Sequence, residues 1–166
     1  MEDRRTKREA EASRRNLHLA KLGLKSAADE GFEQLPLPER RKREQAWTSK
    51  KEKLASPNFI VSDVRLSVRS LPTSITEEKL QDMAFRAAEK GAPSSAGQPK
   101  IHQVKIIRDE ERLDERGTPR SRGFGFVHFE KHEHALAALN EMSDNATILS
   151  GGKMLLVEFA VDNVQK

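Results

Sequence analysis

Apolar and polar residues follow two different spacings over the C-terminal two thirds of the chain. Alternation in four segments predicts strands over residues 64–71, 101–108, 122–129 and 154–160. Between these strands, two segments carry apolar residues at i, i+3, i+4 and i+7, which predicts two helices packed on one face of a sheet. The two stripes are Leu80, Met83, Ala84 and Ala87, then Ala135, Ala138, Leu139 and Met142. The order β-α-β-β-α-β predicts a ferredoxin-like α+β fold with its second sheet face uncovered.

Local signals support these boundaries. Pro72 ends the first strand, in which Leu66 and Val68 are expected to point inward. Thr76 is expected to cap the first helix, since two glutamates follow it and acids suit a helix N-terminus. Loops are expected over residues 91–100, over the charged stretch 109–121 and over residues 143–153. In the last strand the residues expected to face inward are Leu155, Val157 and Phe159.

The third strand contains the octapeptide from residue 122 to residue 129, Arg-Gly-Phe-Gly-Phe-Val-His-Phe. Because alternate side chains of a strand face opposite sides, Gly125, Val127 and Phe129 should enter the core, while Phe124 and Phe126 should lie on the open face. Two phenyl rings on a solvated face are favourable only if something flat stacks on them, and single-stranded bases are flat. The competing interpretation is an ordinary strand whose exposed aromatics contact a protein partner or an internal helix.

This octapeptide, with residues 66–71 on the first strand, resembles the two motifs of the RNA recognition motif (RRM) family. The resemblance covers roughly residues 63–162 and implies RNA binding on the sheet. It implies stacking on Phe124 and Phe126, with Arg122 contacting a phosphate or a base edge. Further RNA-binding candidates are Arg69, Lys105, His128 and Arg120. Arg120 belongs to the 109–121 loop, where neighbouring acids make a simply solvated loop an equal alternative.

Two residues depart from the family pattern on the sheet face. Ser67 stands where the six-residue motif usually has an aromatic, which removes one stacking platform worth about 1–3 kcal/mol per base. Glu158 is expected to face outward on the last strand, where its carboxylate would repel phosphate. Both departures predict a suboptimal RNA face.

The basic charge lies in the N-terminal segment, and we divide the chain into a partly helical extension (1–57) and an RRM (58–166). Residues 1–60 hold 15 of the 30 lysines and arginines but only 10 of the 26 acids. A helix is expected over residues 39–54, too polar to be a core helix, and its basic residues are candidates for RNA backbone contacts. These candidates are Arg40, Arg41, Lys42, Arg43, Lys50 and Lys51. The interpretation that we prefer for this helix is a solvated one, because charged helical faces are usually hydrated. Its Trp47 is either an anchor for a partner or docked on the chain's own RRM.

Shorter segments, residues 14–20, 59–62 and 132–136, resemble a late RRM of multi-RRM nucleolar ribosome-assembly proteins. The resemblance implies one RRM of a longer protein, located in the nucleolus of the nucleus. Its implied partners are pre-ribosomal RNA and other assembly proteins. The alternative function is a structural, protein-interacting RRM within a ribonucleoprotein. We expect no enzymatic activity, cofactor, metal site, small-molecule substrate or membrane association, since no membrane-spanning run, metal-ligand cluster or nucleophile–base arrangement is present in the sequence.

Overall fold

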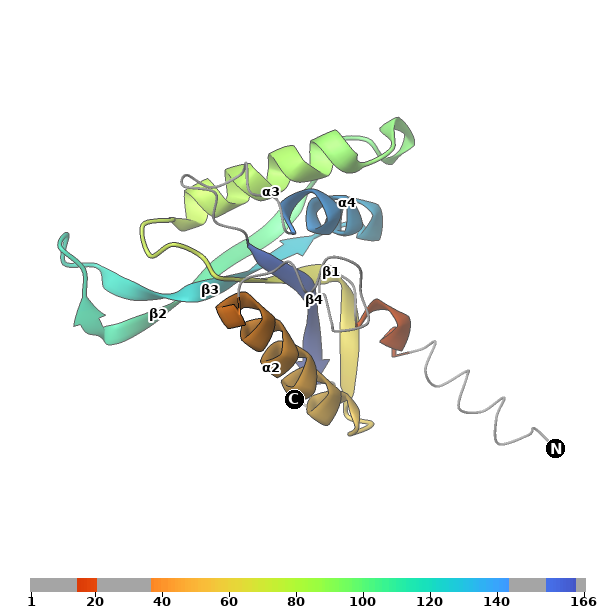
Figure 1. Ribbon diagram of the computed structural model, residues 1–166. Helices are drawn as coiled ribbons and strands as arrows, with labels where there is room; N and C mark the ends of the chain where they lie inside the picture. Colours follow the sequence, from red (N-terminus) through yellow and green to blue (C-terminus); the bar gives the residue numbers. More distant parts are fainter. Residues whose placement is uncertain (1–14, 21–36, 144–154, 164–166) are drawn as a thin grey trace.

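A computed structural model describes residues 15–20, 37–143 and 155–163, and it shows one antiparallel four-stranded sheet in the order β2-β3-β1-β4. Helices α3 and α4 lie on one face of this sheet, and α2 lies on the other (Figure 1). The predicted α+β fold is therefore confirmed, with one more helix against the sheet than expected. The elements in chain order are η1 (Leu17–Leu19), α2 (Leu37–Leu54), β1 (Phe59–Arg69), α3 (Glu77–Gly91), η3 (Ser94–Ala96), β2 (Ile101–Leu113), β3 (Pro119–Phe129), α4 (His132–Met142) and β4 (Leu156–Asn163).

The core lies between the sheet and helices α3 and α4, where both predicted stripes are buried. At the start of α3, the Thr76 hydroxyl accepts a hydrogen bond from the backbone N–H of Lys79, as the capping signal predicts. From the sheet, Leu66, Val127 and Phe129 are fully buried, which confirms their inward orientation. No helix in the described parts of the chain is long and apolar enough to cross a membrane.

The prediction of a charged loop over residues 109–121 is wrong, because β2 and β3 continue into this stretch as a projecting hairpin (Figure 1). The turn is closed by Asp114, whose side chain accepts hydrogen bonds from the backbone N–H groups of Arg116 and Thr118. Gly117 provides the positive φ of 81° that this tight turn needs. The Asp-x-x-Gly signal was therefore present in the sequence among the charges. Most of the third expected loop, over residues 143–153, lies outside the residues that the structure describes.

Part of the N-terminal segment packs on the domain. Leu19 and Ala20 join the main core, next to the start of β1. Just before them, the Arg15 guanidinium donates hydrogen bonds to three carbonyls, of Leu54, Ser56 and Phe59. These contacts join η1 to the C-terminal end of α2 and to β1, so the described residues before position 58 belong to the same packed unit.

Helix α2 is not a solvated helix, contrary to the preferred interpretation of its polar sequence. Ala46 packs on Leu156 of β4, and Trp47 contacts both this cluster and the main core. Of the two alternatives for Trp47, the structure shows docking on the chain's own domain. Lys50 is also buried, and its ammonium group donates hydrogen bonds to Glu158 and to the Phe159 carbonyl on β4. The helix is held by a small apolar contact and a buried charge rather than by an apolar stripe.

Candidate nucleic-acid interface

The strand register brings the predicted aromatic residues to the middle of the sheet face. Phe126 on β3 pairs with Ser67 on β1 and with Lys105 on β2. Ser67 in turn pairs with Glu158 on β4. These four residues form one row across the sheet, and Phe124 begins the next row beside Arg69. The alternation of β3 thus places both rings on the face opposite the core, as predicted.

Phe124 and Phe126 are partly exposed and contact each other edge to face, with centroids 6.4 Å apart. The Arg65 guanidinium lies over the Phe126 ring, 4.9 Å from its centroid. Arg65 is held there by an ion pair with Asp162 at the end of β4. The Phe126 ring therefore already stacks on a planar cation, and a base that stacks on the same face of this ring must displace the Arg65 guanidinium.

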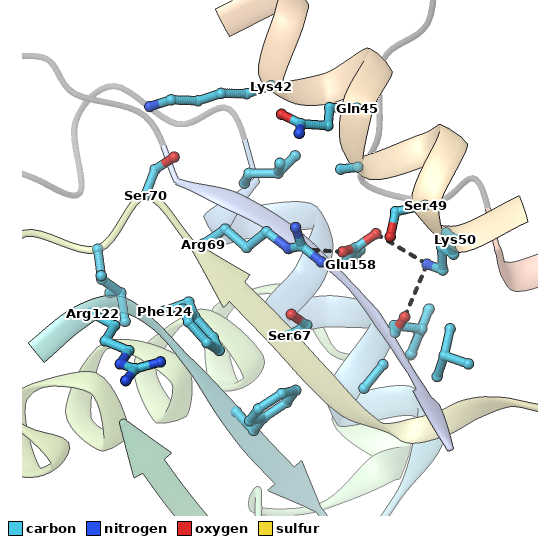
Figure 2. Close-up of a pocket in the computed structure, with 18 of the residues that line it drawn as sticks. Lys42, Gln45, Ser49, Lys50, Ser67, Arg69, Ser70, Arg122, Phe124 and Glu158 are labelled. Carbon is cyan, nitrogen blue, oxygen red and sulfur yellow. Dashed lines mark hydrogen bonds and ion pairs between the residues drawn. The ribbon is translucent and has the colours of Figure 1, made fainter. Parts of the chain in front are cut away.

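A groove of about 780 Å³ separates α2 from this part of the sheet (Figure 2). The two phenyl rings and Ser67 line its sheet side. The cations that line it are Lys42, Lys50, Lys53, Arg65, Arg69 and Arg122. Among its described lining residues the only acid is Glu158. The groove therefore combines aromatic rings with an excess of positive charge, as a site for unpaired nucleotides requires.

The expectation that Glu158 repels phosphate is wrong. Its side chain is only 4% exposed and lies between two cations, Lys50 at 3.2 Å and Arg69 at 3.3 Å. Lys50 also donates a hydrogen bond of 2.9 Å to the carbonyl of Phe159. Burial lowers the pKa of Lys50 below its ordinary value of 10.5, although the Glu158 carboxylate acts in the opposite direction. A carboxylate paired in this way adds little negative field to the groove.

The structure separates the predicted RNA-binding residues into two groups. Arg122, Phe124, Phe126 and Arg69 all line the groove. Lys105 and His128 lie on the same sheet face but outside the groove lining, and the His128 ring contacts that of His102. Arg120 is exposed in the hairpin, opposite Asp109. The groove thus gathers the central candidates, while the others lie at its periphery.

The predicted backbone-binding residues of α2 are also divided. Lys42 lines the groove, whereas Arg40, Arg41 and Lys51 lie outside its lining. The structure corrects two of the six, because Arg43 and Lys50 are buried and do not present a charge to solvent. Groove residues that were not predicted from the sequence are Gln45, Ser49, Lys53 and Arg65. The three on α2 continue a helical spacing from Lys42, which was a usable signal.

Among the described residues no group of three histidine or acidic side chains is placed to hold a metal ion. The three histidines in or just before α4 are His128, His132 and His134, and two of them contact backbone carbonyls. His132 Nδ1 lies 2.7 Å from the Asp63 carbonyl, and His134 Nε2 lies 3.1 Å from that of Gly97. These two rings thus bind the backbone of neighbouring segments.

Comparisons with known proteins found a family model and a curated relative that match this chain. Residues 97–150 match the model of the RNA recognition motif family. RNA-binding protein 28 of Homo sapiens is 31% identical over 154 residues, which make up 92% of this chain. The chain spans only 19% of the length of that relative.

Two solved structures are also similar. The crystal structure of the RNA-binding protein PG1 is 29% identical and has a TM-score of 0.43, covering 58% of this chain and 93% of that one. A Sxl-lethal protein–RNA complex is 31% identical and has a TM-score of 0.41, covering 60% of this chain and 49% of that one.

Proposed function

Because the chain contains a domain of the RNA recognition motif family, we propose that it binds single-stranded RNA in the groove between α2 and the sheet. One or two unpaired bases stack on Phe124 and Phe126, and Arg69 and Arg122 contact the adjoining phosphates. The observation that carries this proposal is a pair of partly exposed rings in a groove lined by five exposed or partly exposed cations and by one acid that the buried Lys50 neutralises. Base stacking on aromatics, with basic groups along the backbone, is the common physical basis of single-strand binding.

A titration of short single-stranded RNAs tests the proposal. The Phe124→Ala/Phe126→Ala protein should bind at least about 5-fold more weakly than wild type, since each stacked base contributes about 1–3 kcal/mol. Phe85→Ala is the matched control, because Phe85 is a partly exposed phenylalanine on α3, across the sheet from the groove. Equal affinities of wild type and the double variant at several salt concentrations would refute stacking.

We further propose that the RNA is a ribosomal precursor and that the protein acts in large-subunit assembly in the nucleolus. The support is the resemblance of residues 14–20, 59–62 and 132–136 to nucleolar assembly proteins, together with the similarity to human RNA-binding protein 28 over most of this chain. A crosslinking map of bound nucleotides in cells should be dominated by precursor ribosomal RNA. A map dominated by messenger RNA would reject this assignment.

A structural, protein-binding role is the second candidate. It is favoured by the loss of one platform at Ser67 and by α2, which covers the β4 side of the face that RNA would otherwise use. In a pull-down from nuclease-treated extract, partners that survive RNA digestion would favour this role. Partners that disappear with the RNA would favour the first candidate.

A further inference from the structure

Helix α2 covers a defined part of the sheet face and leaves the rest open. The residues of β4 that share this face, Leu156, Glu158 and Ala160, are each at most 3% exposed. These three positions of β4 therefore offer little surface to a nucleotide while α2 is docked. Phe124 and Phe126, on the far side of β1, stay partly exposed. RNA that stacks on the two rings thus lies beside α2 and cannot extend over these positions of β4.

The groove side of α2 carries a continuous stripe. Its residues recur at i, i+3, i+4, i+7, i+8 and i+11, which is the spacing of one helix face. They are Lys42, Gln45, Ala46, Ser49, Lys50 and Lys53. Ala46 and Lys50 are buried against β4, whereas Lys42, Gln45 and Lys53 are exposed. Figure 2 shows Lys42 and Gln45 projecting from α2 on the groove side, with Lys42 extended in the direction of Ser70.

The position of this stripe depends on contacts that α2 makes with the domain. The Lys50–Glu158 pair is buried on both sides, and Arg69 binds the second carboxylate oxygen from the sheet. One turn further along, at the C-terminal end of the helix, Arg15 donates a hydrogen bond to the Leu54 carbonyl. Undocking α2 would leave Glu158 without Lys50 and would expose Leu156 to water. These costs favour a helix that stays in place when a ligand enters.

We propose that α2 is a fixed wall of the RNA site, in which Lys42 and Lys53 neutralise phosphates and Gln45 hydrogen-bonds a base edge. This inference rests on the proposed RNA binding and adds a specific role for the preceding helix. The ligand is a short unpaired stretch of RNA, held between the phenyl rings on one side and the helix on the other. A volume of about 780 Å³ is in the range of sites that enclose one small ligand, so roughly one or two nucleotides fit. Lys50, Glu158 and Arg15 are positioning residues, since they hold the wall.

Two matched double variants test the wall. Lys42→Gln/Lys53→Gln and Arg41→Gln/Lys51→Gln each remove two exposed positive charges from α2, but only the first pair lines the groove. For a short single-stranded RNA, we expect the groove pair to reduce affinity at least 5-fold. It should also lower the slope of log affinity against log salt by about 0.7 for each phosphate that is no longer neutralised. An equal decrease in both pairs would overturn the wall, because it would mean that α2 acts only through its overall charge.

A covalent lock distinguishes a wall from a lid. The chain contains no cysteine, so Ala46→Cys/Leu156→Cys introduces the only two thiols, at residues that pack together. They can be joined by oxidation or by a short bifunctional thiol reagent. We expect the locked protein to bind RNA within 2-fold of its reduced form. A decrease in affinity of more than 10-fold on locking would show that α2 must leave, and would overturn the proposal.

The same titrations separate failure of the wall from failure of the proposed function. Wild-type binding that is abolished in Phe124→Ala/Phe126→Ala, but unchanged in Lys42→Gln/Lys53→Gln, would retain the sheet site and reject the wall. Wild-type affinity unchanged in the phenylalanine pair would reject the stacking site itself. Thermal unfolding of each variant checks that it is folded. Gln45→Ala should change the preference among homopolymeric RNAs, and an identical preference would reject its role at a base edge.

Discussion

Replacing Lys50 with methionine removes one cation from a buried ion pair, and we expect the free energy of unfolding to fall by about 3 kcal/mol. Breaking a buried pair by removing one partner costs about 3–5 kcal/mol, because the remaining charge stays desolvated. The lower end applies here because Glu158 keeps Arg69, whose side chain is 47% exposed and stays well hydrated. The Phe159 carbonyl also loses its 2.9 Å hydrogen bond from Lys50.

The double variant Lys50→Met/Glu158→Met separates the cost of the orphaned carboxylate from the value of the pair. Replacing both charges with apolar groups of similar size is often neutral or stabilising, so we expect it to unfold within about 1 kcal/mol of wild type. Lys53→Met is the matched control, an exposed lysine on the same helix, and should change stability by less than about 0.5 kcal/mol.

Urea unfolding followed by two probes measures these effects. Trp47 is the only tryptophan and lies in the contact between α2 and the domain, so its fluorescence reports docking of the helix. Far-ultraviolet circular dichroism reports the whole fold. In Lys50→Met the fluorescence midpoint should fall at least as far as the dichroism midpoint. A destabilisation below about 1 kcal/mol in the single variant, or an equal destabilisation in the single and double variants, would refute the argument that a buried charge holds α2.

Three other perturbations have defined outcomes. The pKa of Lys50 is lower in the folded protein than its ordinary value of 10.5, so the unfolded chain binds more protons at a pH between the two values. The free energy of unfolding of the wild type should therefore rise with pH in that window relative to Lys50→Met. Parallel stability curves for the two proteins would contradict this. Hydrogen bonds from Arg108 lower the pKa of Glu77 below its ordinary value of 4.5, so the stability that Glu77 contributes is present above that value and is lost as pH falls through the folded pKa. The free energy of unfolding should therefore depend less steeply on pH in the acid range in Glu77→Gln than in the wild type. Identical pH dependence in the two proteins would exclude this contribution. Gly125→Ala should cost about 1–3 kcal/mol in urea unfolding, since the added carbon would lie 2.5 Å from the Lys105 carbonyl oxygen of β2, and a wild-type midpoint would show that the strands separate freely.

The elements that the sequence predicted well are those determined by local or periodic signals. The apolar stripes of α3 and α4 predicted both helices and the face that each buries, because residues at i, i+3, i+4 and i+7 lie on one face of a helix and an apolar face packs against a core. Alternation within the octapeptide likewise predicted that Phe129 is buried and Phe126 partly exposed. In each case the chemistry of the side chain and its place in the period agree.

The position of α2 could not be predicted in the same way. Its buried residues are one alanine, one arginine and one lysine, so the apolar periodicity that identifies a packed helix is missing. Lys50 can be buried because its charge is paired with Glu158, which lies 108 positions later in the chain. On the sequence alone, Lys50 resembled a free cation and Glu158 a free anion, and both assignments reversed once the two charges proved to be partners. Long-range charge pairing leaves no periodic signal in a single sequence.

The same pairing explains how residues 61–166, which hold 15 lysines and arginines against 16 acids, can present a cationic groove. Counted along the chain, Glu158 lowers the positive charge of the sheet, and Lys50 raises that of the N-terminal segment. In the folded protein these two charges compensate each other beneath the helix, and Arg69 reaches the second carboxylate oxygen from the groove side. The charges left facing the groove are then Lys42, Lys53 and the arginines of β1 and β3. Neutralising Glu158 by Glu158→Gln should therefore change RNA affinity mainly through the loosened helix, and much less through the removed negative charge.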